Sequence, residues 1–221
     1  MILPRHLRAR VFDLEILDRE RVSPATMERV VRFLRFINRF LGGVGPICSH
    51  LGHGPEPITV LDVACGAGDV LRMVVARRPH VRPIALDHGA DILAFARELP
   101  RMRGDAFRLP FRDRSVDWVI TTLFFHHLTD DQVVAALREF DRVARRGIVV
   151  NDLLRRWRAW FWASVLGLFT DPVVRFDGPL SVRRAYREDE ILALARRAGL
   201  DWLRVRTHFG HRFTLAGERP R

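Results

Sequence analysis

Two hydrophobic patterns alternate along the 221 residues of the chain. Short β-branched or apolar runs are typical of strands buried on both faces, whereas apolar residues that recur every three or four positions are typical of one face of a helix. The apolar runs lie at 58–63, 81–86, within 109–128, and at 147–150, 202–207 and 212–216. The helical patterns lie at 24–41, from 69 onward, and at 89–99, 129–143 and 188–198. This alternation predicts an α/β fold with a doubly wound parallel sheet.

The first long helix has clear start and stop signals. Ser23 is a suitable N-cap, Pro24 suits the first helical position, and Gly42 follows the last apolar position, Leu41. Residues 44–57 contain several prolines and glycines and are expected to be a linker into the core.

The length predicts one domain over residues 1–221. Within it we expect a helical cap and linker (1–57), a core (58–151), a lid insertion (152–186), and a last helix with two closing strands (187–221).

The segment 58–70 combines an apolar strand, a glycine turn and the start of a helix. Such a unit binds phosphate or carboxylate groups, because glycines permit close approach of a ligand and a helix N-terminus presents unpaired N–H groups. The turn glycines are Gly66 and Gly68, and Leu71 stands where a dinucleotide motif needs a third small residue. No Gly-Lys-Ser/Thr follows, so a nucleoside triphosphate loop is not expected.

Acidic residues follow the next two predicted strands. Asp87 lies 19 positions after Gly68, close to the spacing at which a carboxylate meets ribose hydroxyls. Asp105 follows the third strand, where a plain turn residue is the alternative interpretation.

Together these features resemble the motifs of class I S-adenosylmethionine (SAM) methyltransferases, most closely small-molecule enzymes of the ubiquinone/menaquinone type. The resemblance covers residues 20–217. It implies a Rossmann-like sheet of seven strands with an antiparallel last strand and an N-terminal helical cover over the cofactor cleft. It also implies SAM as cofactor, held by Asp62, Ala64, Cys65, Gly66, Gly68, Asp87, His88, Asp105, Ala106 and Leu123. A tight turn in another kind of α/β protein is the alternative.

Further motifs resemble a subgroup found beside type III polyketide synthases. They read N-R-x-L-G-G, L-F-x-H-H-L and D-G-P-L-S-V-R-R-A. This likeness implies O-methylation of an alkylated phenol or enol, such as an alkylresorcinol or alkylpyrone, in secondary metabolism. An enzyme that methylates carbon on a quinone-like ring would look almost the same.

A phenol with a pKa near 10 is mostly protonated at neutral pH, so a base would help its methylation. His126 and His127 follow the fourth strand and are the candidate bases. Adjacent residues rarely both face a cleft, and we favour His127. His208 and His211 are expected in a solvated loop.

Residues 152–186 form the segment least typical of the family. Its aromatic residues follow a group of arginines, a pattern that suits a lid over an apolar substrate, a contact with a membrane surface, or plain core. As a lid, it would contact the acceptor through Trp157, Trp160 and Phe161, together with Asn151 at the end of the fifth strand.

The formal net charge is +11, and the basic residues are all arginine. We interpret this bias as the mark of a GC-rich genome, so nucleic acid is not the expected partner, while contact with an anionic membrane surface stays open. An amino-methylating enzyme of DNA or RNA would carry Asn/Asp-Pro-Pro-aromatic after the fourth strand, where this chain has residues 121–124, T-T-L-F. An RNA or protein methyltransferase and a non-catalytic SAM-binding protein remain alternatives, and the sequence leaves the oligomeric state open.

Two cysteines and the absence of a signal-peptide pattern favour a reducing, cytoplasmic setting. No Cys-x-x-Cys or His-x-x-x-His pair occurs, and Asp130 and Asp131 are interpreted as helix-capping residues. No metal site is therefore expected.

Overall fold

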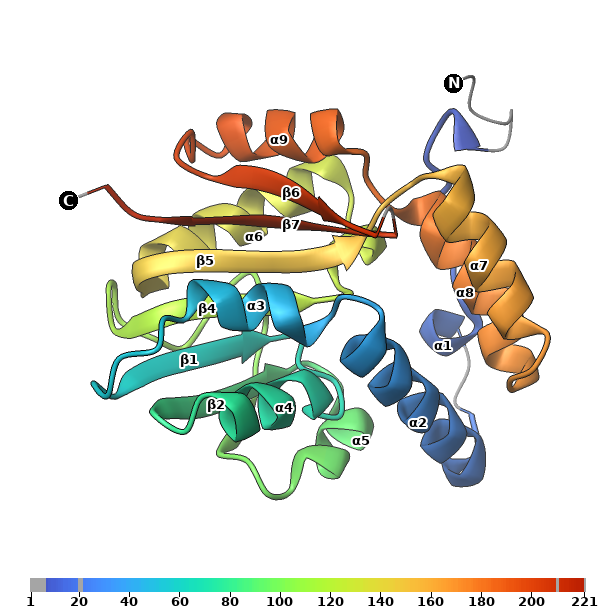
Figure 1. Ribbon diagram of the computed structural model, residues 1–221, viewed down its shortest axis with the longest axis horizontal. Coiled ribbons are helices and arrows are strands. Elements are labelled where there is room, and N and C mark those ends of the chain that lie inside the picture. The colour runs from blue at the N-terminus through green and yellow to red at the C-terminus, as the bar shows by residue number, and fades with distance from the viewer. Residues whose placement is uncertain (1–6, 20–21, 210, 221) are drawn as a thin grey trace.

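The computed structural model describes residues 7–19, 22–209 and 211–220. Its centre is a seven-stranded sheet in the order β3-β2-β1-β4-β5-β7-β6 (Figure 1). The five strands β1 to β5 pair in parallel, and β7 runs antiparallel to both β5 and β6. The predicted fold class is confirmed. The strands are β1 (Ile58–Val63), β2 (Val81–Asp87), β3 (Arg101–Arg103), β4 (Val116–Thr122), β5 (Ala144–Leu153), β6 (Arg204–His208) and β7 (Arg212–Glu218).

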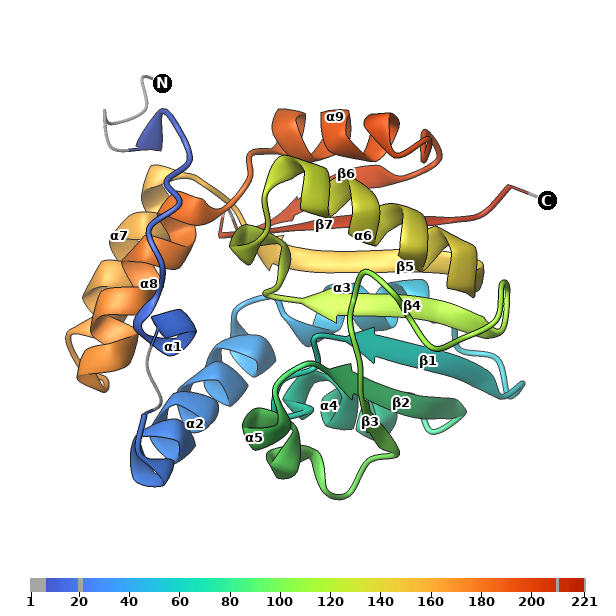
Figure 2. The same cartoon turned by 180° about the vertical axis from the view of Figure 1, so that it is seen from behind.

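The central strands are apolar because helices cover both faces of the sheet (Figures 1 and 2). On one face, α3 and α4 pack on the sheet and form one hydrophobic core; on the other, α6 and α9 form the second. Asp117 at the start of β4 has a structural role, because it accepts a hydrogen bond from Thr59 N (2.9 Å) and pairs with Arg145 (2.6 Å).

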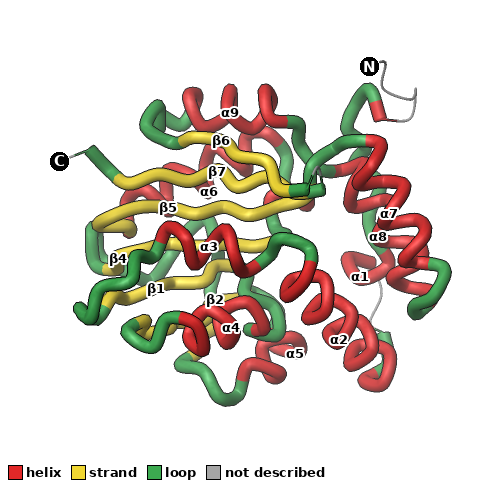
Figure 3. The backbone as a smooth tube through the Cα atoms, viewed as in Figure 1, coloured by secondary structure: helices red, strands yellow, loops and turns green. Residues whose placement is uncertain are grey.

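Four further helices, α1, α2, α7 and α8, gather beyond the carboxyl ends of the parallel strands (Figure 3). They form a helical layer over the end of the sheet at which α/β proteins bind ligands. The helices are α1 (Ile16–Arg19), α2 (Pro24–Phe40), α3 (Val44–His50), α4 (Asp69–Arg77), α5 (Ala90–Leu93), α6 (Asp130–Val143), α7 (Trp157–Gly167), α8 (Pro172–Arg184) and α9 (Glu188–Arg197). Among the described residues, no helix has the length and apolar character needed to cross a bilayer.

The helices α2 and α6 begin where the sequence predicts. The Ser23 hydroxyl accepts a hydrogen bond from Thr26 N (3.2 Å), and Pro24 occupies the first position of α2. Thr129 forms a capping box with Gln132 at the start of α6.

Two predicted segments, 44–57 and 89–99, are wrong in part. The linker 44–57 contains α3, since Pro46 lies in the first turn, where its missing N–H removes no helical hydrogen bond. The helix predicted at 89–99 is divided into α5 and the short 3₁₀ helix Ala94–Ala96. The segment predicted to be a lid insertion folds into the two packed helices α7 and α8, and α8 continues through Pro179.

Candidate active site

A cavity of about 1240 Å³ lies between the carboxyl ends of β1, β2 and β4 and the helical layer. Its floor is the glycine turn after β1, and its other walls come from α1, α2, α7 and α8. Cavities at this end of a parallel sheet are the usual ligand sites of open α/β folds.

The glycine turn needs backbone conformations that few residues adopt. Ala64, Gly66 and Gly68 have φ values of 57°, 54° and 73°. A Cβ atom on Gly68 would lie 2.8 Å from Leu99 Cδ1, so close packing also requires this glycine. Gly68 does not line the cavity; it turns the chain from β1 into α4.

Asp62 has a carboxylate held in the core at the end of β1. The residue is 1% exposed, and its Oδ1 atom has no hydrogen-bond partner among the described residues. Burial and, next, the nearby charge of Asp87 raise the pKa of Asp62 well above its ordinary value. Because Asp62 lines the cavity, a ligand cation such as an ammonium group would meet this unsatisfied oxygen.

Asp87 stabilises the glycine turn through hydrogen bonds and lines the cavity. One carboxylate oxygen accepts a hydrogen bond from Gly66 N and the other from Gly89 N, both at 2.8 Å. Each ionised oxygen has a further lone pair, so Asp87 can still accept hydrogen bonds from two hydroxyls of a ligand.

The other cofactor candidates lie around the same part of the cavity. Asp105 accepts a hydrogen bond from Phe107 N (2.9 Å), an arrangement that also fits the turn interpretation. The remaining candidates that line the cavity are Ala64, Cys65, Gly66, His88, Ala106 and Leu123.

The two adjacent histidines both line the cavity, contrary to the expectation that only one would. They lie in the 3₁₀ helix Phe125–His127, which brings their ring centroids to 4.1 Å. His126 Nδ1 is 2.7 Å from Asp152 Oδ1, and His127 Nδ1 is 3.3 Å from Asp18 Oδ1. Each imidazole is thus oriented by its own carboxylate.

Burial by itself would raise the pKa of Asp152 and of Asp18, but the partners of each carboxylate lower its pKa by more. The charge and hydrogen bond of His126 lower the pKa of Asp152, and His127 together with Arg184 lowers the pKa of Asp18. Glu15 is different: its pKa is raised by burial, despite the charge of His127.

Residues 60–147 match the methyltransferase domain family. A demethylmenaquinone methyltransferase of Thermotoga maritima is 33% identical over 131 residues, which are 57% of this chain and 56% of the relative. One of Mycolicibacterium paratuberculosis is 40% identical over 101 residues, 45% of this chain and 42% of the relative. The chain thus spans about half the length of these curated relatives.

Among solved structures, a SAM-dependent methyltransferase from Aquifex aeolicus superposes with a TM-score of 0.63. It is 20% identical, and the match covers 90% of this chain and 99% of that one. At this identity the likeness shows the fold, while the family match and the curated relatives show the domain type. Residues 60–147 thus match a methyltransferase domain, and the fold of the chain is one that a SAM-dependent methyltransferase shares.

The helix α7 turns a different face to the cavity from the one predicted. Trp157 and Phe161 are 40% and 44% exposed, and neither they nor Trp160 line the cavity, so their assignment as cavity-lining substrate contacts is wrong. The α7 residues that do line it are Ala159, Trp162, Ala163 and Leu166. Since most residues of α7 are apolar, the sequence has no polar stripe from which the inner face could be recognised.

Asn151 was also predicted to contact substrate, and this too is wrong, because it is fully buried behind the cavity wall. Its Oδ1 accepts a hydrogen bond from Arg212 Nη1 (2.9 Å), and Asn38 Oδ1 accepts one from Nη2 (2.8 Å). Arg212 itself lines the cavity, and burial lowers its pKa to about 10. Asn151 therefore positions a cationic cavity residue.

Sequence reasoning missed several polar residues of this cavity. Asp152 could have been suspected, since a polar residue at the end of an apolar strand is typical of an α/β site. His211, expected in a solvated loop, lines the cavity, whereas His208 bonds Thr214 Oγ1 (2.9 Å) and does not. Glu15 and Asp18 reach the histidines from α1 and its approach, and no local sequence signal predicts that.

Proposed function

We propose that this protein transfers a methyl group from SAM to a hydroxyl of a small lipophilic phenol or enol. The observation that carries the proposal is one cavity holding an unsatisfied buried carboxylate, a hydroxyl-accepting carboxylate and a pair of oriented imidazoles. The methyltransferase family match supports the reaction type.

The donor end of the cavity fits SAM group by group. Asp62 would accept the ammonium of the methionine part, and Asp87 the two ribose hydroxyls. Asp105, Ala106 and His88 would border the adenine. SAM supplies an electrophilic methyl group, and the protein supplies orientation, which is worth about 7–11 kcal/mol when reacting atoms are held in line at about 3 Å.

The acceptor end would bind and ionise the hydroxyl. The rings of His126 and His127 line the cavity, and the Nδ1 atom of each pairs with a carboxylate. The Nε2 atoms are therefore the sites that would accept the hydroxyl proton. The remaining walls of the acceptor end, from α2, α7 and α8, are chiefly apolar and suit an alkyl chain; their residues include Val30, Val31, Leu34, Ala163, Leu166 and Val174.

A quinone-like acceptor methylated on carbon is the second candidate, favoured by relatives named demethylmenaquinone methyltransferases. An RNA or protein acceptor and a non-catalytic SAM-binding role have no comparable support in the geometry of the cavity.

The acceptor would reach the cavity from a membrane surface. Exposed Phe161 and Trp162 lie edge to face on α7 with ring centroids 5.4 Å apart, and Trp162 also lines the cavity. Exposed arginines at 156, 158 and 175 flank these aromatic residues in α7 and α8 and complement an anionic lipid surface.

The reaction can be tested with SAM and a panel of alkylated phenols, pyrones and quinones, measured by the mass gain of one methyl group. Acid-stable methyl ethers are expected from the phenols. Products only from quinones would establish the second candidate, and no product from any of them, with SAM bound, would contradict both.

The cofactor assignment can be tested by calorimetry on Asp87→Ala. Loss of a charge-assisted pair of hydrogen bonds should weaken SAM binding by about 1.5–3 kcal/mol, or roughly 10- to 150-fold. Asp91→Ala removes an exposed carboxylate four positions later that does not line the cavity, and should leave the affinity unchanged. Equal affinities for the two variants would refute the ribose assignment.

A further inference from the structure

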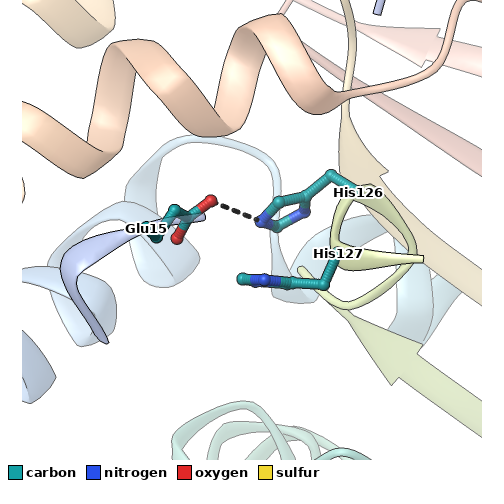
Figure 4. Close-up of side chains that lie close together, drawn as sticks. All are labelled: Glu15, His126 and His127. Carbon is teal, nitrogen blue, oxygen red and sulfur yellow. Dashed lines mark ion pairs between the residues drawn. The ribbon is translucent and has the colours of Figure 1, made fainter. Parts of the chain in front are cut away.

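The two histidines face a third potential ligand, Glu15, which comes from the opposite side of the cavity. Figure 4 shows both rings projecting from one turn toward the Glu15 carboxylate. His126 Nε2 is 3.8 Å from Glu15 Oε1, and one donor atom from each of the three residues lies within 4.8 Å of the other two. Glu15 and His126 are buried, at 5% and 4% exposure.

The carboxylates behind the histidines leave their outer nitrogens free to bind an ion. An imidazole that donates its Nδ1 proton to a carboxylate keeps an unprotonated lone pair on Nε2, and this pairing is the usual support of a metal-bound histidine. Asp152 provides it for His126 at 2.7 Å, and Asp18 for His127 at 3.3 Å. Both rings carry this support.

The charge around the histidines is strongly negative. Four carboxylates, those of Glu15, Asp18, Asp152 and Asp177, surround them, while Arg184 is the guanidinium that pairs within this group among the described residues. Arg184 Nη1 lies 2.7 Å from Asp18 and 3.7 Å from Glu15. Arg212 adds a second buried positive charge, which interacts with Asp152. With neutral imidazoles the group still has two excess negative charges in a largely buried place, which a bound cation would reduce.

Arg10 does not supply the missing charge. It contacts His126 only through the backbone oxygen, at 3.5 Å, and pairs instead with Asp130 at 3.0 Å. Ser181 donates a hydrogen bond to Glu15 Oε1 at 2.7 Å, which orients the carboxylate without neutralising it.

We propose that Glu15, His126 and His127 bind a divalent transition-metal ion of the zinc type. Two imidazoles and one carboxylate are a donor set that zinc and similar ions accept in tetrahedral sites with one open position. Donor atoms about 2.0–2.1 Å from a tetrahedral ion lie about 3.3 Å apart, so binding needs side-chain movements of about 1.5 Å or less. The sequence did not indicate this site, because Glu15 is far from the histidines along the chain.

The role of the ion in catalysis rests on the proposed function. When the Nε2 atoms hold the ion they no longer act as bases, so an acceptor hydroxyl that binds the open position of the ion would lose its proton to water instead. The resulting oxyanion forms the new C–O bond as the methyl C–S bond breaks, and the bonding electron pair stays on sulfur. The products are the methyl ether and S-adenosylhomocysteine.

Metal binding can be measured without activity. Chelator-treated full-length protein, titrated with Zn²⁺, should bind one ion per chain by calorimetry and show a higher Tm. Co²⁺ in place of Zn²⁺ should give the visible absorption of a tetrahedral site, which His127→Asn and Glu15→Gln should abolish. Each of these variants should lower Zn²⁺ affinity by roughly 100-fold or more, and Asp152→Asn by about 10- to 100-fold.

His53→Ala is the matched control, since His53 is an exposed histidine outside the cavity. Zn²⁺ binding unchanged in His127→Asn and lost in His53→Ala, or no binding to the wild-type protein, would overturn the proposal. Because SAM binding is measured separately on chelator-treated protein, retained SAM binding and methyl transfer without metal would reject the ion and leave the proposed function standing. Metal binding without SAM binding would support the metal site and contradict the proposed function.

Discussion

Asp62, the proposed contact of the SAM ammonium group, lowers the stability of the fold. Its carboxylate is buried at 1% exposure with one oxygen unpartnered among the described residues, and burial together with Asp87 raises its pKa. A carboxyl with a raised pKa in the folded state destabilises that state wherever the unfolded chain is ionised. Below the ordinary Asp pKa the penalty is absent; it grows as the pH rises from there toward the folded-state pKa.

Asp62→Asn should therefore raise Tm at pH 7, with a gain that shrinks as the pH falls toward 4. The same change should weaken SAM binding by roughly 10- to 150-fold, because a charge-assisted contact of about 1.5–3 kcal/mol is lost. Thermal unfolding over pH 4–8 and calorimetry with SAM measure the two effects. A lower Tm at pH 7 with unchanged SAM affinity would contradict both assignments.

Gly68 has a purely conformational role, since its φ of 73° is left-handed and it does not line the cavity. Gly68→Ala should lower the free energy of unfolding by about 1–2 kcal/mol, because a side chain is strained in the left-handed region of φ. The close contact of the new Cβ atom with Leu99 should lower it further. For a chain of this size the change should lower Tm by at least about 2–8 °C in a thermal scan.

Gly45→Ala is the control for that substitution. Gly45 lies exposed in α3 at an ordinary φ, and nothing lies within 4 Å of the position that a Cβ atom would take there, so alanine should leave Tm unchanged or raise it. Similar losses in both variants would show that the conformation of the glycine turn is not the cause.

At the scale of elements, the sequence predicted α2 and α6 almost to the residue because each has a capping side chain and one apolar face. It failed for α7 and α8. Their residues are apolar on several sides, one helix contains Pro179, and they become helices that face the cavity by packing on each other.

The inner face of α7 should set the length of acceptor chain that the cavity accepts. Ala163 lines the cavity beside Gly178 of α8, so both positions leave space between the helices. Ala163→Phe should fill that space and raise KM for long-chain acceptors, by about 0.8 kcal/mol or roughly fourfold per methylene excluded, and leave short-chain ones unaffected.

Val165→Phe on the same helix, at a position that does not line the cavity, should not alter chain-length preference. Steady-state kinetics with a homologous series of acceptors distinguishes the two variants. An equal effect of both on all chain lengths would mean that α7 is not a wall of the acceptor site.

At the scale of the molecule, the excess of arginine and the exposed aromatic residues of α7 and α8 suit contact with an anionic bilayer. The full-length protein should bind vesicles that contain anionic lipid more tightly than neutral ones, and the preference should fall with salt. Sedimentation with vesicles measures this binding.

Phe161→Ser with Phe169→Ser should weaken vesicle binding, since these side chains are 44% and 84% exposed. Arg158→Ala should weaken it as well, whereas Arg112→Ala, in the loop before β4 at the opposite end of the sheet, should not. Equal binding by all of these variants would contradict a docking surface on α7 and α8.

The sequence by itself determined the sheet, the glycine turn and the carboxylates at the ends of β1 and β2. These features depend on local rules: apolar runs make buried strands, positive φ favours glycine, and loops after parallel strands meet at one edge. It also indicated the histidine pair as candidates.

Only the tertiary structure decided which residues surround those histidines. Glu15 and Asp18 precede them by more than 100 positions and line the same cavity, and Arg184, more than 50 positions after them, pairs with both carboxylates. No periodicity or spacing encodes such a meeting, since it results from the packing of α1 and α8 over the sheet edge. The same packing determines which face of α7 lines the cavity, and it buries Asn151 behind Arg212. Burial is a property of the assembled core and not of a single segment.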